Sequence, residues 1–494
     1  MFRKRLVQIG VLSLVVMILA SCTSPAPSQI APTCPPPEAC VCPTCPAQTG
    51  EVETQPTEEP VLSAMAVPSR EDGYIGPELT TENITLRILR SSLRPEQEAL
   101  IAVWYQEFMT AHPNIKIEEE VVPFGEIAQK VQTMVAANAL PDIIYGDGPF
   151  VKAYVYNDLL LPLDDYVSQE FLDDIIPATR AELSVDGKLY SFPWEQSTMV
   201  MYYNRQMFEN AGIPIPSETT NPDEGYTWEQ ALDVWKKLTL DPSGTGSPTV
   251  WGLGPSGFGP GGPGSNYYFE GIFLRSFGDK DAPQDSSAYK TFLGLSPDGT
   301  TASGYVDTPE AVAAMEFYQS LFQEHKVTPT GAIPDSFVTQ AAATFILTDI
   351  GVTRYRDRGF TVGYTPVPHG ATTFAHGGST SYMINKKTEY PAEAAAYLVY
   401  IHNNFNRLRW AQARGSMPAR ISVFDMLPQY QTYPYTLLSN TLVNATYPRP
   451  ATAGWSEFQS IMDATIKDIA LGGDPREFLE NAAVEIDSAL AKYK

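Results

Sequence analysis

Two carboxylates in this chain stand where they could act on a bound molecule. Asp147 follows Asp142-Ile-Ile-Tyr145, an apolar run typical of a buried strand, and Glu195 ends the aromatic stretch Phe192-Pro-Trp194-Glu195. A carboxylate pair suits the acid/base cleavage of a glycosidic bond, or it accepts hydrogen bonds from ligand hydroxyls without any reaction. The sequence favours binding, so we expect no catalytic residue, and a secreted glycosidase that uses these two carboxylates is the alternative.

Other reactive groups lack the required spacing. His112, His325, His369, His376 and His402 form no metal-ligand pattern, and the chain has no Walker A sequence and no Gly-x-Ser-x-Gly elbow. Gly257 to Gly262 matches a dinucleotide pattern, but Pro260 interrupts it and no helix is expected to begin at the last glycine. We therefore expect no metal site and no cofactor.

Net charge, length and cysteine content limit the classes of binding partner, the number of domains and the chemistry that this chain can have. The chain has 494 residues and a formal net charge of −24, which opposes polyanions, so we expect no nucleic-acid partner. Since single cores stop growing at roughly 250 to 300 residues, the length predicts two core-forming units. All five cysteines precede residue 46, so the folded body has no catalytic thiol and no disulfide.

The N-terminal segment has the pattern typical of an export signal. Arg3, Lys4 and Arg5 precede a short apolar run, and Leu19-Ala20-Ser21-Cys22 resembles the bacterial lipobox. We expect a signal peptide over 1–21, lipid attachment at Cys22 and an extracytoplasmic protein anchored to the bacterial cell membrane; an ordinary secretory signal is the alternative. Residues 22–82 are rich in proline and predict a disordered tether. Its remaining cysteines favour local disulfides over zinc, with their state left open: Cys34, Cys40, Cys42 and Cys45.

From Ile84 onward, strand and helix patterns alternate. Strands are expected at 84–88, 115–117 and 142–145, with a helix beginning at Pro95 and another near 126–138. This alternation predicts an α/β fold with a mostly parallel sheet that binds ligands at the carboxyl ends of its strands. Further helix starts are expected at Thr227-Trp-Glu-Gln230, Asp307-Thr-Pro-Glu310 and Asp474-Pro475.

The folded body resembles the family 1 extracellular solute-binding proteins, the maltose-binding-protein-like receptors of ABC importers. The resemblance covers about residues 84 to 494 and depends on segments that occur in the family's order. They are Pro141-Asp142-Ile-Ile, Gly187-Lys-Leu-Tyr-Ser-Phe-Pro193, Met201-Tyr-Tyr-Asn204, Gly212-Ile-Pro, Tyr226-Thr-Trp-Glu229, Lys236-Lys-Leu-Thr239, Val367-Pro368-His-Gly370, Gly377-Gly378-Ser379, Gly415-Ser-Met-Pro-Ala-Arg420 and Arg449-Pro450 before Trp455.

This resemblance implies a two-lobed, periplasmic-binding-protein-like (type II) fold, with hinge crossings near 190–194, 360–364 and Arg414. Lobe 1 would comprise 83–192 and 361–413, and lobe 2 would comprise 193–360 and 414–494. The family implies a monomer that captures a sugar or oligosaccharide, closes on it and delivers it to ABC permease subunits. A surface sensor or adhesin of the same fold is a further alternative.

The ligand-binding residues that the resemblance implies are Asp147, Trp194, Glu195, Gly377, Gly378, Ser379 and Trp455. Asp147 and Glu195 would accept hydrogen bonds from ligand hydroxyls. The two tryptophans would stack on sugar rings or pack in the core, and the two glycines would let backbone approach the ligand or form a plain turn. The segment 343–354 departs from the family pattern and places Arg354 where an aromatic residue is common. With Arg356 and Arg358 it would pair with an anionic ligand or balance surface charge, and the sequence leaves this open.

Overall fold

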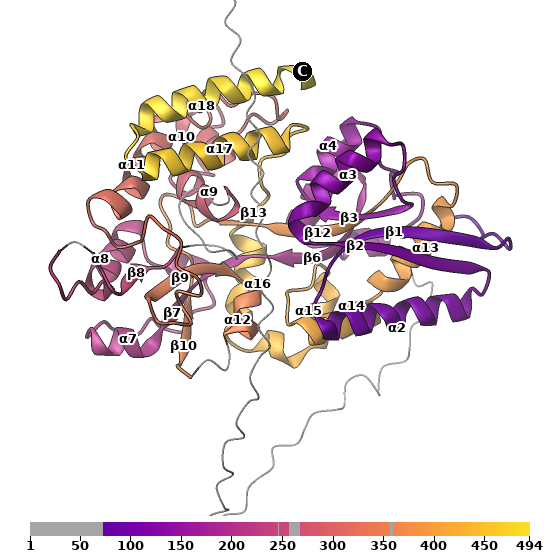
Figure 1. Cartoon of the computed structure of the whole chain (residues 1–494), viewed down its shortest axis with the longest axis horizontal. Helices are drawn as coiled ribbons and strands as arrows, with labels where there is room; N and C mark the ends of the chain where they lie inside the picture. Colours follow the sequence, from indigo (N-terminus) through magenta and orange to yellow (C-terminus); the bar gives the residue numbers. More distant parts are fainter. Residues whose placement is uncertain (1–72, 246, 256–266, 356–358) are drawn as a thin grey trace, which may run out of the picture. The chain divides into compact units, whose positions relative to one another are not determined.

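Two mixed sheets organise the part of the chain that the structure describes. The computed structural model describes residues 73–245, 247–255, 267–355 and 359–494. The predicted signal peptide, Cys22, the other four cysteines, the segment 257–262, Arg356 and Arg358 lie outside the described residues. The first sheet has the order β2-β1-β3-β12-β6 and the second has the order β10-β7-β9-β8 (Figure 1).

The bounds of the main strands are β1 Ile84–Ser91, β2 Ile115–Val122, β3 Ile143–Asp147, β6 Ser191–Ser197, β7 Met199–Asn204, β8 Trp251–Leu253, β9 Ala342–Thr348, β10 Val362–Thr365 and β12 Gly378–Ile384. Two short ladders are formed by β4 Ser184–Val185 with β5 Lys188–Leu189, and by β11 Ala375–His376 with β13 Thr446–Tyr447.

The predicted strands at 84–88, 115–117 and 142–145 are confirmed as parts of β1, β2 and β3, and β1 is parallel to both neighbours. The prediction of mostly parallel sheets is confirmed, with one strand of each sheet running against the others. β12 runs antiparallel to β3 and β6, and β7 runs antiparallel to β9 and β10. β12 enters the first sheet after the chain has passed through the second sheet.

Helices pack on both sheets. We call the first sheet with its helices the first lobe, and the second sheet with its helices the second lobe. The first lobe holds α2 Pro95–Ala111, α3 Ile127–Ala136, α4 Phe150–Tyr156, α5 Gln169–Asp173, α6 Pro177–Leu183, α13 Pro391–His402 and α14 Asn404–Arg414. The second holds α7 Arg205–Asn210, α8 Trp228–Leu238, α9 Tyr267–Ser276, α10 Ser287–Leu293, α11 Pro309–Gln323, α12 Ile350–Arg354, α16 Tyr435–Asn444, α17 Trp455–Ala470 and α18 Pro475–Leu490. Helix α15 Ile421–Met426 packs on α14, and single 3₁₀ turns lie at Phe124–Glu126, Pro222–Glu224, Pro428–Gln431 and Ala491–Tyr493.

Short-range signals set the helix starts. Thr227 and Gln230 form the predicted capping box of α8, in which each side chain accepts a hydrogen bond from the other residue's backbone N–H. Pro309 opens α11 behind the N-cap Thr308, and Asp474 caps α18. A cap contributes about 1 kcal/mol, so these residues fix where each helix begins.

The chain passes between the lobes through Thr198, the single residue between β6 and β7. Because β6 pairs with β12 from Ser191 to Ser197, the first lobe extends to Ser197 rather than ending at 192. The predicted return at 361 also moves, because β10 pairs with β7 in the second sheet and the chain rejoins the first sheet only at β12. The remaining lobe boundaries stay predictions.

The predicted tether ends earlier than residue 82. Tyr74 forms a bridge with Val167, and the backbone N–H of Thr80 donates to Glu393 on α13 at 2.6 Å. Residues 73–82 therefore belong to the folded body, because the first lobe offers them an apolar surface and hydrogen-bond partners. Among the described residues, none of the helices has the length and apolar character to cross a bilayer.

Candidate functional site

Asp147 ends β3 and meets a side chain of the other lobe. Its two carboxylate oxygens accept hydrogen bonds from Nη1 and Nη2 of Arg449, both at 2.7 Å. Arg449 follows β13 and its side chain is 6% exposed, whereas that of Asp147 is 22% exposed. This two-pronged ion pair joins the lobes at the carboxyl end of a parallel strand, where α/β sheets place their ligands.

A second carboxylate shares Arg449. Glu182 on α6 lies 3.4 Å from Nε of Arg449, and its side chain is 4% exposed. Burial raises the pKa of Glu182, and the nearby positive charge of Arg449 offsets part of that rise. Ser379, fully buried on β12, donates its hydroxyl hydrogen to Glu182. Asp147, Glu182, Ser379 and Arg449 thus form one cluster, which we call the carboxylate cluster.

The glycines before Ser379 allow close packing at this cluster. A Cβ atom on Gly378 would lie 2.6 Å from Oγ of Ser197 and 2.8 Å from the hydroxyl of Tyr268, and one on Gly377 would lie 2.6 Å from the amide of Gln196. Tyr268 on α9 and Ser197 on β6 hydrogen-bond each other at 2.9 Å, so the glycines let the two lobes meet. The predicted approach of a ligand to this backbone stays a prediction.

Glu195 lies within β6, shortly before the crossing at Thr198. Its carboxylate accepts hydrogen bonds from Nε1 of Trp410 at 2.6 Å and from the hydroxyl of Ser416 at 2.8 Å, and it lies 2.9 Å from Nε of Arg414. The residue is 6% exposed. These partners come from α14 and the segment after it, so Glu195 ties two chain crossings together. Its predicted contact with a ligand stays a prediction.

Asp147 and Glu195 flank the same residue of β12. Both are in register with Thr380, Asp147 on one side and Glu195 on the other. Since neighbouring strands lie about 4.8 Å apart, the two backbones are separated by roughly 10 Å. The structure thus brings these residues to one edge of the sheet, with each carboxylate engaged by an arginine.

Both predicted stacking tryptophans are buried. Trp194 is 1% exposed within the first-lobe core, and Trp455, also 1% exposed, begins α17 and stacks on Phe458 at 5.8 Å between ring centroids. The guanidinium of Arg449 lies 5.7 Å from the ring centre of Trp455. Trp455 therefore packs near the Arg449 guanidinium of the carboxylate cluster, and stacking of either tryptophan on a ligand stays a prediction.

Arg354 belongs to α12, an element that contributes no residue to the carboxylate cluster. It ends α12, its Nη2 is 3.5 Å from Asp335, and its guanidinium lies 5.6 Å from the ring centre of Tyr355. Its side chain is 34% exposed. These contacts fit the charge-balancing interpretation, and pairing with an anionic ligand stays untested.

Phe124 is a candidate site residue that the sequence patterns do not single out. This residue follows β2 directly after Pro123, is 49% exposed, and places its ring 6.3 Å from that of Tyr145 on β3. Because β1, β2 and β3 are parallel, Phe124 and Asp147 lie at the same edge of the first sheet. The signal available was an aromatic residue in a Pro-Phe-Gly turn immediately after a strand.

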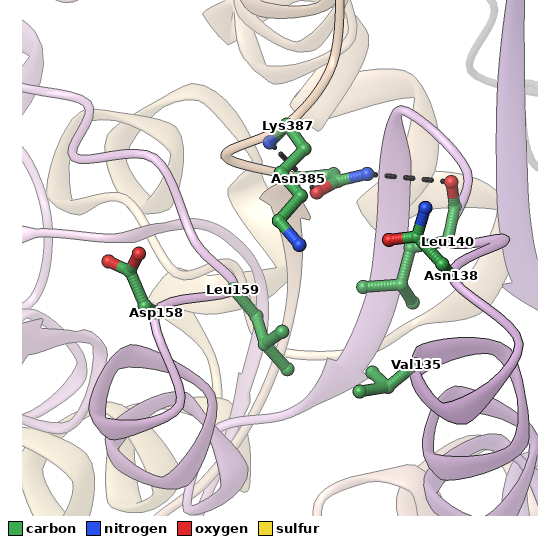
Figure 2. A pocket seen from close by; sticks show the side chains of 7 residues that line it. All are labelled: Val135, Asn138, Leu140, Asp158, Leu159, Asn385 and Lys387. Atoms are coloured by element: carbon green, nitrogen blue, oxygen red, sulfur yellow. Dashed lines mark hydrogen bonds between the residues drawn. The ribbon is translucent and has the colours of Figure 1, made fainter.

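A separate cavity lies at the opposite end of β3. It has a volume of about 160 Å³ and is lined by residues of the first lobe alone (Figure 2). The lining residues are Val135, Asn138, Leu140, Asp158, Leu159, Asn385 and Lys387. Leu140 precedes β3 and Asn385 follows β12, whereas Asp147 is the last residue of β3, so this cavity is distinct from the carboxylate cluster.

Two α/β lobes linked by crossing strands, with charged side chains of both lobes meeting at strand ends, define the class of two-lobed solute-binding proteins. The model of the family described as bacterial extracellular solute-binding protein matches residues 91–404. This match covers more than half of the chain, and the chain belongs to this family.

Individual relatives are distant in sequence and close in fold. A Brucella abortus protein whose name describes it only as a binding protein is 24% identical over 78% of this chain and 88% of its own. An ABC transporter solute-binding protein of Thermotoga lettingae, solved with α-D-tagatose, has a TM-score of 0.66 and 20% identity over 82% of this chain and 99% of that one. The GacH receptor of Streptomyces glaucescens, solved unliganded and with acarbose, has a TM-score of 0.66 and 19% identity over 83% of this chain and 99% of that one. These structures confirm the two-lobed fold.

Proposed function

We propose that this protein is an extracytoplasmic receptor that captures a sugar or oligosaccharide between its lobes and delivers it to the permease of an ABC importer. The observation that carries this proposal is the ion pair between Asp147 and Arg449, which joins the two lobes at a strand edge. A solute that contacts both lobes binds the closed state better and so shifts the population toward it. Tagatose and acarbose in the neighbouring structures support a carbohydrate solute.

The test is a thermal-shift and calorimetry screen of the mature protein with tagatose, mannitol, maltotriose and acarbose, followed by chromatography of each mixture. We expect at least one sugar to raise the melting temperature, because a ligand that binds only the folded state stabilises it. The same sugar should be recovered unchanged. Turnover of any sugar would support the glycosidase alternative, and the absence of binding to every sugar would overturn the receptor proposal.

Anchoring at Cys22 is a separate part of the proposal, supported by the lipobox resemblance. Several acyl chains on one cysteine would hold the protein durably, since a single chain gives only marginal membrane binding. Intact mass spectrometry of membrane-extracted protein should show an N-terminal acylated Cys22 with residues 1–21 removed. Cleavage at another bond, or an unmodified Cys22, would contradict this prediction.

Replacing Phe124 with alanine should weaken sugar binding about tenfold. The half-exposed ring offers an apolar face at the edge that carries Asp147, and covering most of a Phe side chain is worth ~1.5 kcal/mol or more. Calorimetric titration with the sugar found in the screen measures the change. Val121→Ala, at an exposed apolar residue near the end of β2, is the matched control and should bind normally. Equal affinity of the two variants would exclude Phe124 from the site.

A further inference from the structure

Three basic side chains at the junction of the lobes, among the residues that the structure describes, are engaged within the protein. Arg449 is shared by Asp147 and Glu182, Arg414 lies 2.9 Å from Glu195, and Nζ of Lys152 donates to the backbone carbonyls of Asp298 and Ala451, both at 3.1 Å. A carboxylated or phosphorylated solute needs a cation whose hydrogen-bond donors face it. Such a solute would have to compete with these internal partners.

The carboxylate cluster has more acidic groups than basic ones. Asp147 and Glu182 both belong to the first lobe, and the single guanidinium of Arg449 lies between them. Arg449 is held in place by its two bonds to Asp147 and by the aromatic rings of Tyr268 and Trp455, whose centres are 5.3 and 5.7 Å away. An arginine fixed in this way does not reorient at low cost to bind a second anion.

We propose that Arg449 sets the charge class of the solute: by saturating its guanidinium with Asp147 and Glu182, it makes the site accept uncharged, hydroxyl-rich molecules and reject sugar acids and sugar phosphates. This inference rests on the proposed capture of a carbohydrate. A solute hydroxyl group can donate a hydrogen bond to a remaining lone pair of Asp147, whose side chain is 22% exposed, without adding charge. An anionic group at the same place meets like charges, which cost several kcal/mol when they lie side by side.

The experiment compares matched pairs of probes on the mature protein by calorimetry at low ionic strength. The pairs are tagatose with tagatose 6-phosphate, mannitol with mannonate, and glucose with glucuronate. For every neutral probe that binds, we expect the charged partner to bind at least ~10-fold more weakly. A charged probe that binds as tightly as its neutral partner would overturn the inference and leave the proposed function standing.

A charge-neutralising variant tests the role of Arg449 directly. Asp147→Asn with Glu182→Gln keeps the shapes of both side chains and leaves the guanidinium without an anion. We expect the ratio of charged to neutral affinity to rise at least ~10-fold, and the gain to shrink with added salt. Adding Arg449→Gln to this variant should abolish the gain. An unchanged ratio in the folded double variant would overturn the inference.

The matched control removes the same two charges elsewhere on the first lobe. Asp173→Asn with Glu118→Gln changes two exposed carboxylates, each of which pairs with a surface cation. This control should leave the affinity ratio unchanged, and an equal gain in it would overturn the role of Arg449 in favour of the total charge. If no probe of either kind binds, the proposed function fails and this inference fails with it.

Discussion

Replacing Trp194 with alanine is expected to lower the free energy of unfolding by ~3–5 kcal/mol, the usual cost of removing a large side chain from a packed core. The indole is 1% exposed and its ring centre lies 4.6 Å from that of Trp410 and 4.9 Å from that of Tyr382. The guanidinium of Arg407 lies 3.8 Å from the same ring centre. Urea denaturation followed by tryptophan fluorescence and circular dichroism measures the change.

Two further variants serve as comparisons for the stability loss expected in Trp194→Ala. Trp194→Phe keeps an aromatic ring in the core and should cost less than the alanine variant. Trp251→Ala, at a less buried tryptophan on β8, should also cost less. A loss below ~1 kcal/mol in Trp194→Ala would place the ring outside the core. A weaker sugar affinity in a stable Trp194→Phe protein would support the predicted stacking role instead.

Short sequence patterns predict many of the strands and helix starts of this fold. The alternating apolar residues of Ile84 to Ile88 predict a strand, and Pro95, Pro309 and the Thr227 capping box predict helix starts that the structure confirms. Each signal lies within a few residues of the feature it predicts, because caps and first turns depend on nearby backbone groups. The ordered family segments identified the fold, and the family match confirms it.

The candidate site depends on contacts between residues that are far apart in the sequence, and no short sequence pattern predicts such contacts. Asp147 and Arg449 are 302 positions apart, and a carboxylate after a strand gives no sign of the arginine that binds it. The sequence shows an aromatic residue beside Glu195 but not which way it faces. In the strand β6, Trp194 turns into the core while Glu195 turns toward the crossing, and the neighbours from α14 decide both positions.

The reversed direction of β12 within a mostly parallel sheet could not be predicted for a similar reason. Alternating strands and helices predict parallel neighbours only while the chain stays in one lobe. After Thr198 the chain enters the second lobe, and it returns through β12, which pairs antiparallel to β3 and β6. The order of crossings sets these directions, and it depends on the packing of whole lobes rather than on the residues of the strand.

Asp349 occupies the same crossing region, and its buried carboxyl predicts a stability that depends on pH. It follows β9, is 2% exposed, and accepts a hydrogen bond from the backbone N–H of Met417 at 2.9 Å. Its Oδ1 has no hydrogen-bond partner among the described residues. Burial raises the pKa of Asp349 to about 7, and the negative charge of Glu195 adds to the rise while the Met417 N–H and Arg414 oppose it.

Asp349→Asn is therefore expected to stabilise the protein at pH 8 and to have little effect near pH 4. Between about pH 4 and 7 the folded protein keeps a proton that the unfolded chain releases, so the stability of the natural protein falls as pH rises through this window. The rise from 3.8 to about 7 sets the gain from the substitution at no more than ~4 kcal/mol above pH 7. Asparagine still accepts the hydrogen bond from Met417 and carries no charge to bury.

Urea denaturation of both proteins at pH 5, 6, 7 and 8 measures this gain as a function of pH. Asp173→Asn changes the net charge equally at an exposed carboxylate and should give a difference that stays constant across the series. A constant difference for Asp349→Asn as well would mean that Asp349 is ionised in the folded protein throughout. A difference that grows toward pH 8 would show that a proton on Asp349 stabilises the junction between β9 and the segment after α14, where the chain passes from one lobe to the other.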